Sequence, residues 1–245
     1  MQLVPEYLKL TRKWKEEYGE KTLVLMQVGS FFEVYALRGS DGVIKGSDIQ
    51  QFAKINDMLI TPKSRMFVEG NVVLMAGFGL AQLDKYVKKL QEHGYTIAVY
   101  TQDIQGKNTT RSLAEVISPG TFFSLETEDT SNTTMCVWLE HVKGNRFMPE
   151  SMVSGIATLD IFTGKTTMYQ NMVPYHHNPC SYDELERLVA IHRPRECIIV
   201  SKTEDKIVND IITFVGLDNI KTHIVDENTS LGKYAAKAEK QVYQK

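Results

Sequence analysis

Met26-Gln27-Val28-Gly29-Ser30-Phe31-Phe32-Glu33-Val34-Tyr35 is the stretch that decides the fold of this chain. It continues an uncharged, mostly apolar run that starts at Thr22, and such a run is typical of a buried β-strand. Gly29 and Ser30 interrupt the run, and two aromatic residues and a carboxylate follow where a turn would favour small polar residues. In an extended chain, Phe31 and Glu33 share one face and Phe32 takes the other. We therefore predict that one ring anchors the core while its neighbour stands outward beside an acid.

This decapeptide resembles the mismatch-reading loop of the MutS family of DNA mismatch-repair proteins, whose pattern is Gly-Asp-Phe-Tyr-Glu after an apolar strand. Phe31 and Glu33 fall on the Phe-x-Glu pair of that family. The resemblance continues at Leu74-Met-Ala-Gly77 and at Val116-Ile-Ser-Pro-Gly-Thr121, in the same order and at similar spacing. Three motifs in register along one chain are far more specific than any of them alone.

Two residues depart from the family pattern, because Ser30 stands in place of Asp and Phe32 in place of Tyr. Neither change removes the outward ring or the acid. The resemblance implies that Phe31 wedges between base steps of duplex DNA and that Glu33 hydrogen-bonds the mispaired base. A mismatched or unpaired base is already poorly stacked, so a wedge that ignores sequence becomes selective for defects. In the alternative interpretation, both Phe31 and Phe32 are core residues and Glu33 is a solvated surface acid.

The resemblance also places two pairs of basic residues toward DNA. Lys63 and Arg65 lie in a predicted polar loop, and Lys107 and Arg111 lie in a second one. Lysine and arginine side chains in such loops suit phosphate contacts. The alternative is that all four are ordinary solvated surface charges.

Met75 and Gly77 match the Met-Ala-Gly turn of the family, which approaches the backbone of the duplex. A glycine suits a close approach because it has no side chain. The resemblance therefore adds both residues to the candidate DNA contacts, with packing in the core as the alternative for Met75.

Length and composition are those of a soluble globular protein with one large domain or two ordinary ones, since the chain has 245 residues, 42% of them hydrophobic and 24% charged. No apolar stretch approaches the roughly 18 residues that a membrane helix needs. The first residues also lack the basic start and apolar core of a signal peptide, so we predict an intracellular protein without a membrane partner. Cys136, Cys180 and Cys197 are an odd number without a Cys-x-x-Cys motif, which favours free thiols.

The formal net charge of −2 is a poor match for a protein that holds DNA by charge alone. Basic residues slightly outnumber acidic ones up to Thr121, and the balance reverses beyond it. We therefore assign any DNA contact to the first part of the chain and expect weak binding by this chain in isolation.

Hydrophobic periodicity predicts alternating strands and helices in the first part, and hence a mixed sheet covered by helices. Residues 1–122 are the predicted mismatch-recognition domain, and the polar residues 123–133 are the predicted linker. The expected elements are a helix over 7–18 ending at Gly19, a strand over 22–28, a helix over 47–58 capped by Ser47 and Asp48, a polar loop over 61–65, strands over 71–78 and 95–100, and a helix over 83–90 closed by Gly94.

Residues 134–245 are the predicted second domain. Three antiparallel strands followed by alternating helix and strand resemble the RNase H-like connector domain that follows the mismatch reader in MutS proteins. The last residues, 231–245, are predicted to form a helix that stops without a cap, as if the chain had been cut. The other expected elements are strands over 134–140, 153–160 and 165–170 with a Thr163-Gly164 turn, helices over 182–192 and 204–215, a strand over 197–200 and a short strand near His223.

Two enzyme classes remain as alternatives. Gly77-Phe-Gly79 resembles the start of a dinucleotide fingerprint, with Asp103 at a suitable distance for a ribose contact, although Gln82 stands where the pattern wants Gly or Ala. An RNase H-like domain also raises the possibility of a metal-dependent nuclease, which needs several converging carboxylates. The candidates for that role are Asp160, Asp183, Glu184, Glu186 and Asp205, all of which capping or charged turns would also explain.

Neither a metal motif nor a nucleotide motif is complete in this sequence. His176-His177 with Cys180 fits no standard zinc spacing, so we predict no metal site. The sequence lacks the Gly-x-x-x-x-Gly-Lys-Ser/Thr loop that cradles nucleotide phosphates. We therefore expect no enzyme activity and no cofactor in this chain.

The resemblance implies an N-terminal fragment of a larger protein, whose ATP and magnesium site lies in a C-terminal domain absent from this sequence. It also implies three partners, namely mismatched double-stranded DNA, a second MutS-like subunit and a MutL-like protein on the connector.

Overall fold

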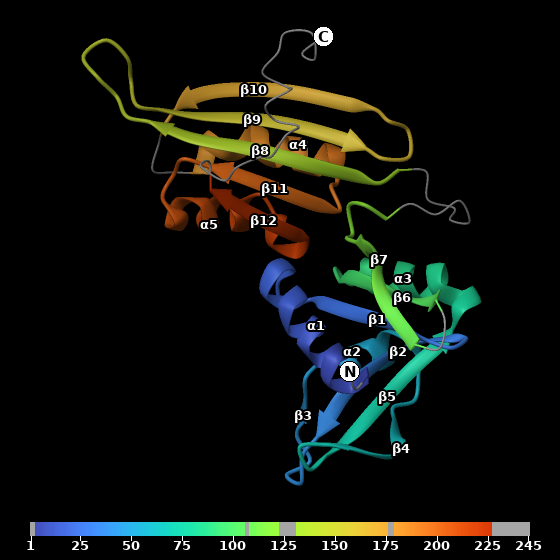
Figure 1. Ribbon diagram of the computed structural model, residues 1–245. Helices are drawn as coiled ribbons and strands as arrows, with labels where there is room; N and C mark the ends of the chain where they lie inside the picture. Colours follow the sequence, from blue (N-terminus) through green and yellow to red (C-terminus); the bar gives the residue numbers. More distant parts are fainter. Residues whose placement is uncertain (1–2, 106–107, 123–130, 176–178, 227–245) are drawn as a thin grey trace. The chain divides into compact units, whose positions relative to one another are not determined.

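The computed structural model describes residues 3–105, 108–122, 131–175 and 179–226. The chain divides into two compact units, residues 1–128 and residues 129–245, and each has its own sheet (Figure 1). The predicted class, α/β with mixed sheets and helices, is confirmed. Most of the predicted linker, residues 123–130, and the predicted final helix over 231–245 lie outside the described residues.

Seven strands among the described residues form the sheet of the first unit, in the order β4-β5-β2-β1-β6-β7, with β3 paired to β2. The pair β1 and β6 is parallel and the other pairs are antiparallel, so the sheet is mixed. The elements are α1 (Leu3–Tyr18), β1 (Thr22–Val28), β2 (Phe31–Arg38), β3 (Ile44–Lys45), α2 (Ile49–Asn56), β4 (Thr61–Val68), β5 (Asn71–Gly79), the short 3-10 helix η1 (Leu80–Gln82), α3 (Leu83–Glu92), β6 (Thr96–Gln105) and β7 (Asn108–Ile117).

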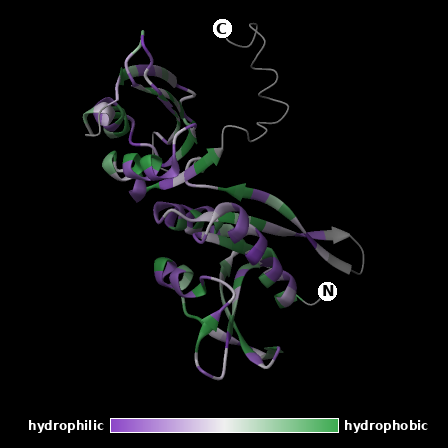
Figure 2. Ribbon diagram, turned by 90° about the vertical axis from the view of Figure 1, so that its left-hand side faces the viewer, coloured by the Kyte–Doolittle hydropathy of each residue, from purple (hydrophilic) through white to green (hydrophobic). Residues whose placement is uncertain are grey.

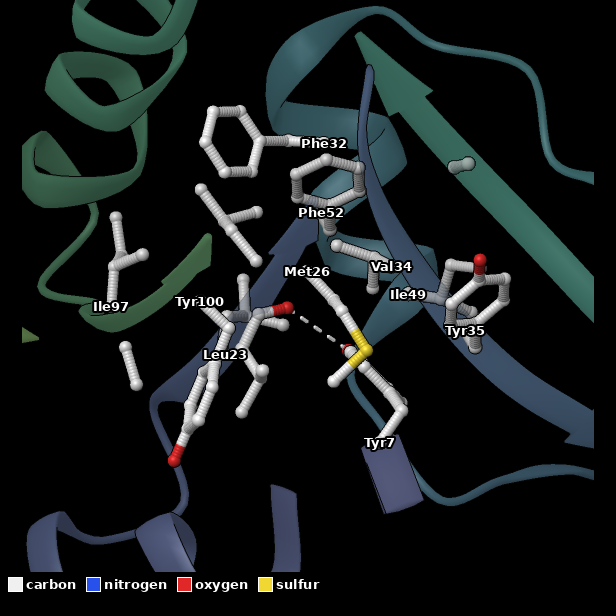
Figure 3. Packing of buried hydrophobic residues seen from close by; sticks show 14 of the residues in the cluster. Tyr7, Leu23, Met26, Phe32, Val34, Tyr35, Ile49, Phe52, Ile97 and Tyr100 are labelled. Atoms are coloured by element: carbon white, nitrogen blue, oxygen red, sulfur yellow. Dashed lines mark hydrogen bonds between the residues drawn. The ribbon is translucent and has the colours of Figure 1, made fainter. Parts of the chain in front are cut away.

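Strand β1 lies in the middle of this core. Four successive residues, Leu23 to Met26, are fully buried, and because side chains alternate along a strand, both of its faces are covered. Helix α1 packs against β1, and the Tyr7 hydroxyl donates a hydrogen bond of 3.1 Å to the Val24 carbonyl oxygen (Figure 3). This double burial explains the uninterrupted apolar run in the sequence.

The helices are amphipathic, as their periodicity predicts. Val4, Tyr7, Thr11 and Trp14 form the buried side of α1 at a spacing of three to four residues. Gly19 follows the helix with a φ of +89°, a conformation that suits glycine and ends the helix. Figure 2 shows hydrophilic and hydrophobic residues side by side along the helices of this unit.

Some local predictions for the first unit are wrong. Residues 61–65 are not a polar loop but the start of β4, which pairs with β5 through an irregular register. The Met-Ala-Gly residues, which the resemblance describes as a turn, lie within β5, in agreement with the strand predicted over 71–78. Asp48 precedes α2 without capping it by a side-chain hydrogen bond, because its carboxylate accepts the hydroxyl of Tyr95 instead.

The second unit has a five-stranded sheet in the order β10-β9-β8-β11-β12. Strands β8, β9 and β10 are antiparallel neighbours, whereas β11 runs parallel to both β8 and β12. Helices α4 and α5 lie on one face of the sheet (Figure 1), and their apolar residues pack on its buried side chains. The elements are β8 (Thr133–Val142), β9 (Ser151–Asp160), β10 (Thr166–Pro174), the 3-10 helix η2 (Pro179–Tyr182), α4 (Asp183–His192), β11 (Glu196–Ser201), α5 (Asp205–Phe214), the 3-10 helix η3 (Leu217–Asn219) and β12 (Lys221–Asp226).

Over the described ranges, no helix combines the length and apolar character that crossing a bilayer requires.

Candidate nucleic-acid interface

Phe31 and Phe32 are the first two residues of β2, and their side chains lie on opposite faces of the strand. Phe31 is 55% exposed, whereas Phe32 is 4% exposed and its ring packs against Phe78. Figure 3 shows Phe32 close to Phe52 in the core. The backbone of Phe31 is nevertheless held on both sides, because it pairs with Val28 of β1 and with Gly79 of β5. One ring therefore anchors the strand and the adjacent ring projects from it.

The turn before Phe31 is tight and needs a glycine. Gly29 has a φ of +60°, a left-handed conformation that residues with a side chain rarely adopt. The Ser30 carbonyl oxygen accepts a hydrogen bond of 3.1 Å from the backbone N–H of Leu80, which ties the turn to the end of β5. The turn thus fixes the position of Phe31, the first residue of β2.

Two glutamines, Gln27 and Gln102, form hydrogen bonds that hold this turn. The Gln102 side-chain oxygen accepts the backbone N–H of Gly29 at 3.2 Å, and the backbone N–H of Gln102 donates to the Gln27 side-chain oxygen at 3.0 Å. The Gln27 amide nitrogen in turn donates to the Gly29 carbonyl oxygen at 3.1 Å. Arg111 adds a bond of 2.8 Å from its Nε to the Gln27 carbonyl oxygen. Hydrogen bonds from β1, β6 and β7 therefore hold the turn in a chain that has Ser30 instead of the aspartate of the MutS pattern.

Glu33 lies two residues beyond Phe31 and is ion-paired. Its Oε2 accepts a hydrogen bond of 2.7 Å from the Lys63 ammonium of β4 and another from the Tyr35 hydroxyl. Lys63 also donates to the Tyr35 oxygen at 2.8 Å and lies 4.6 Å from the centre of the Tyr35 ring. Burial, followed by the hydrogen bond to Glu33, raises the pKa of Tyr35 well above its ordinary value, so this phenol stays protonated.

Gly77 lies inside β5, opposite Glu33. A Cβ at this position would meet the Phe32 carbonyl oxygen at 2.5 Å and the Glu33 Cα at 3.2 Å. The structure therefore gives Gly77 a role in packing β5 against β2. Met75 is partly buried on the same strand and packs against the core.

The basic candidates occupy different positions. Lys63 and Arg65 are both on β4, and Lys63 is the partner of Glu33 described above. The sequence prediction of a loop around Arg111 is wrong. Arg111 lies on β7, because β6 and β7 form a long antiparallel pair. Lys107 lies outside the described residues. The structure thus brings Lys63 close to Glu33 and brings Arg111 to the turn that precedes Phe31.

The geometry around Gly77-Phe-Gly79 differs from that of a dinucleotide site. In such a site the glycines form the turn between strand and helix. Here Gly77 and Gly79 are ladder residues of β5, paired with Glu33 and Phe31. Asp103 lies on β6, where its carboxylate accepts the Ser112 hydroxyl at 3.1 Å. These contacts speak against the nucleotide-dependent alternative.

The acids considered for a nuclease have local roles. Asp160 accepts hydrogen bonds from the Ser131 hydroxyl and from the backbone N–H groups of Phe162 and Thr163, so it organises the turn after β9, and these bonds hold its pKa below the usual value. Asp183, Glu184 and Glu186 occupy the first turn of α4, and Asp205 occupies the first turn of α5. No group of three metal-ligating side chains forms within the described part of the chain. His176 and His177 lie outside that part.

Three residues of this site were missed by the sequence analysis, namely Gln27, Tyr35 and Gln102. A usable signal exists for the glutamines, because each is a polar residue in or just beyond the apolar core of a buried strand. Their partnership depends on the parallel pairing of β1 with β6, which local sequence does not reveal.

Comparison with known proteins agrees with this architecture. Residues 7–126 match the family model described as MutS domain I, which corresponds to the first unit. The chain is 24% identical over 230 residues to a DNA mismatch repair protein mutS homolog of Acanthamoeba polyphaga mimivirus, covering 91% of this chain and 20% of the relative. It is 27% identical over 205 residues to the DNA mismatch repair protein MutS of Methanococcoides burtonii, covering 78% of this chain and 20% of the relative.

A third relative, DNA mismatch repair protein MutS 1 of Haloarcula marismortui, is 29% identical over 168 residues, covering 69% of this chain and 16% of the relative. The chain spans about a fifth of the length of the curated relatives first mentioned. Family match, matching motifs and fold agree, and the first unit is therefore a MutS domain I, in a chain that is similar over most of its length to MutS proteins.

Proposed function

We propose that this chain supplies the part of a MutS-like DNA mismatch-repair protein that reads mismatched or unpaired bases. The single observation that carries the proposal is the exposure of Phe31 on a rigid strand end beside the buried Phe32. Single exposed apolar side chains are common, so the support comes from this exposure combined with the backbone pairing of Phe31 on both sides and its place in the Phe-x-Glu pair of the MutS pattern.

Duplex DNA with a defect fits the chemistry of this ring. Proteins that kink duplexes push apolar side chains between base steps, at a cost of a few kcal/mol of unstacking. That cost is lowest where a base is mispaired or unpaired. A rigidly held Phe31 would therefore enter defects more easily than regular duplex, and Glu33 would hydrogen-bond the displaced base.

Phosphate contacts are the second component of the proposal. Lys63, Arg65, Lys107 and Arg111 are the candidate basic residues, and the strand that carries Met75 and Gly77 is proposed to pass close to the duplex backbone. The net charge of −2 argues that these contacts are few, so the affinity of this chain for regular duplex should be low.

The second unit is proposed to be an RNase H-like connector that relays the DNA contact to other parts of the protein. The sheet order β10-β9-β8-β11-β12, with three antiparallel strands followed by parallel ones, supports this assignment. ATP hydrolysis with magnesium would belong to a further domain, so this chain is proposed to have no catalytic activity of its own. A second MutS-like subunit and a MutL-like protein remain proposed partners.

The test is a competition titration with the full-length protein, using a matched duplex and the same duplex with one mismatch. Phe31→Ala should abolish the preference for the mismatch. Phe67→Ala is the matched control, because Phe67 is also an exposed phenylalanine of the first unit but lies on β4. Equal mismatch preference in the wild type and in Phe31→Ala would refute the proposal.

Glu33→Gln tests the second half of the site. The amide keeps the shape of the side chain but removes its charge, so discrimination should weaken. Affinity for matched DNA should stay the same or rise, because a carboxylate near phosphates is repelled. A loss of affinity for matched and mismatched DNA in equal measure would contradict the assigned role.

A further inference from the structure

We propose that Lys63 is a specificity-determining residue, which holds Glu33 as a hydrogen-bond acceptor and thereby selects displaced bases that offer an N–H group. This inference rests on the proposed function and assigns to Lys63 a task other than phosphate binding. Its basis is the arrangement of three side chains from β2 and β4, Glu33, Tyr35 and Lys63.

Both donors of this cluster meet the same oxygen of Glu33. The Lys63 Nζ is 2.7 Å from Oε2, and the Tyr35 hydroxyl donates to that oxygen as well. The 2.8 Å bond from Lys63 to the Tyr35 oxygen closes the triangle. The Glu33 side chain is 12% exposed and that of Lys63 is 22% exposed, so water competes poorly for these bonds. The carboxylate is thus fixed in orientation by two donors.

The other oxygen, Oε1, is left available. Among the described residues it makes no hydrogen bond or ion pair, and it is not one of their fully buried unpartnered polar atoms. A carboxylate oxygen can only accept hydrogen bonds, whereas a protonated carboxyl group could also donate one. The Lys63 ammonium and the Tyr35 hydroxyl both donate to Oε2, so neither of them occupies Oε1. Oε1 can therefore accept a hydrogen bond from a donor on a bound ligand.

An oxygen that only accepts limits the groups that Glu33 can recognise to N–H donors. A displaced thymine offers one such donor, its ring N–H, and the other bases offer a ring N–H or an amino group. A purine N7 is an acceptor and repels the carboxylate. The predicted ligand is thus an N–H group of a mispaired or unpaired base, and an unpaired thymine presents it at a single position.

A phosphate contact by Lys63 makes a different prediction. Removing a lysine that touches only phosphate weakens binding about uniformly across sequences and lowers the salt dependence. If Lys63 acts through Glu33, its removal changes the discrimination between mismatched and matched DNA, and it does so only while the Glu33 carboxylate is present. A double-mutant cycle separates the two.

The experiment measures, for the full-length protein, the ratio of affinities for a duplex with one unpaired thymine and for its matched parent. Lys63→Met should lower this ratio about tenfold, as loss of a good base contact does. In the Glu33→Gln background, the same change should leave the ratio unaltered. Lys63→Arg should restore most of the ratio because it keeps the charge. Lys45→Met is the matched control, since Lys45 is an exposed lysine of β3 in the same sheet.

A modified base provides a readout that a merely structural role of Lys63 would not move. Replacing the unpaired thymine by N3-methylthymine removes the ring N–H. The wild-type ratio should then fall to that of Lys63→Met, and Lys63→Met itself should be insensitive to the methyl group. Thermal unfolding of Lys63→Met establishes that the variant is folded at the temperature of the titration.

Two outcomes would overturn the inference, namely an equal effect of Lys63→Met with and without the Glu33 carboxylate, or a wild-type ratio that does not respond to N3-methylthymine. In either case, a loss of preference in Phe31→Ala would leave the proposed function standing. If Phe31→Ala also keeps its preference, the proposed function itself fails.

Discussion

Gly77 lies directly opposite Glu33 in the β2–β5 ladder, so close to that strand that a methyl group on Gly77 would meet the Phe32 carbonyl oxygen at 2.5 Å. Backbone atoms cannot move aside as the end of a flexible side chain can. The two strands are therefore packed at a distance that only glycine permits, at the point where the candidate site begins.

Gly77→Ala should destabilise the first unit by about 1–3 kcal/mol, the usual cost of overpacking. Gly79→Ala is the matched control on the same strand, because its Cβ would find only the Ser30 carbonyl oxygen, at 4.0 Å. Urea unfolding of both variants measures the difference. Equal stability of the two would show that β5 can shift without cost.

The two adjacent phenylalanines should differ sharply in their contribution to stability. Phe32→Ala removes a ring packed against Phe78 and should lower the free energy of unfolding by about 3–5 kcal/mol. Phe31→Ala removes an exposed ring and should cost less than about 1 kcal/mol. Chemical denaturation followed by tryptophan fluorescence reports on this unit, since Trp14 lies in its core. A large loss in Phe31→Ala would mean that its ring supports the fold.

Gln102 should control the rigidity of the turn that carries Phe31. In Gln102→Ala, the backbone N–H of Gly29 loses its acceptor, and its hydrogen exchange should accelerate about five- to tenfold, as expected for a bond of about 1 kcal/mol. Amide exchange followed by NMR measures this rate. Gln51→Ala, at an exposed position of α2, is the control and should leave Gly29 unchanged. Unaltered exchange in Gln102→Ala would show that other contacts hold the turn.

The three cysteines should react with thiol reagents in a fixed order. Cys180 is exposed, Cys136 is half-buried, and Cys197 is buried. Burial raises the pKa of Cys136, and burial followed by the neighbouring Cys136 and Glu196 raises the pKa of Cys197 to about 12. Because the thiolate is the reactive form, raised pKa values slow modification at pH 8. Mass spectrometry after brief labelling should find Cys180 modified first and Cys197 last; early labelling of Cys197 would contradict its burial.

The sequence was sufficient for elements whose burial is local and complete. Strand β1 has the predicted bounds because both of its faces are covered and Gly29 ends it. The division between Phe31 and Phe32 also follows from strand alternation, with one ring outside and the other inside. In both cases a few neighbouring residues contain all the necessary information.

The strands at the two ends of the first sheet were missed because their sequences lack a clear apolar alternation. Strand β4 contains Pro62 and an irregular register, features that are tolerated at sheet edges. Strand β7 begins with the polar residues 108–112 and is recognisable only through its pairing with β6. An edge strand gains its structure from a neighbour, so its own residues reveal it poorly.

The contacts of the site were beyond local reasoning for the same physical reason. Lys63 meets Glu33 from thirty positions further along the chain, and Tyr95 takes the carboxylate of Asp48 away from capping α2. Each of these polar groups has several plausible partners nearby in sequence. Only the folded sheet decides which of them is used.

Because Phe31 is paired with strands on both sides and two glutamines hold its turn, the backbone that carries the ring has little freedom to move back. Whatever it presses against has to yield instead. In the proposed encounter with DNA, regular and defective duplexes would then be distinguished by how easily the DNA deforms, because the protein surface changes little.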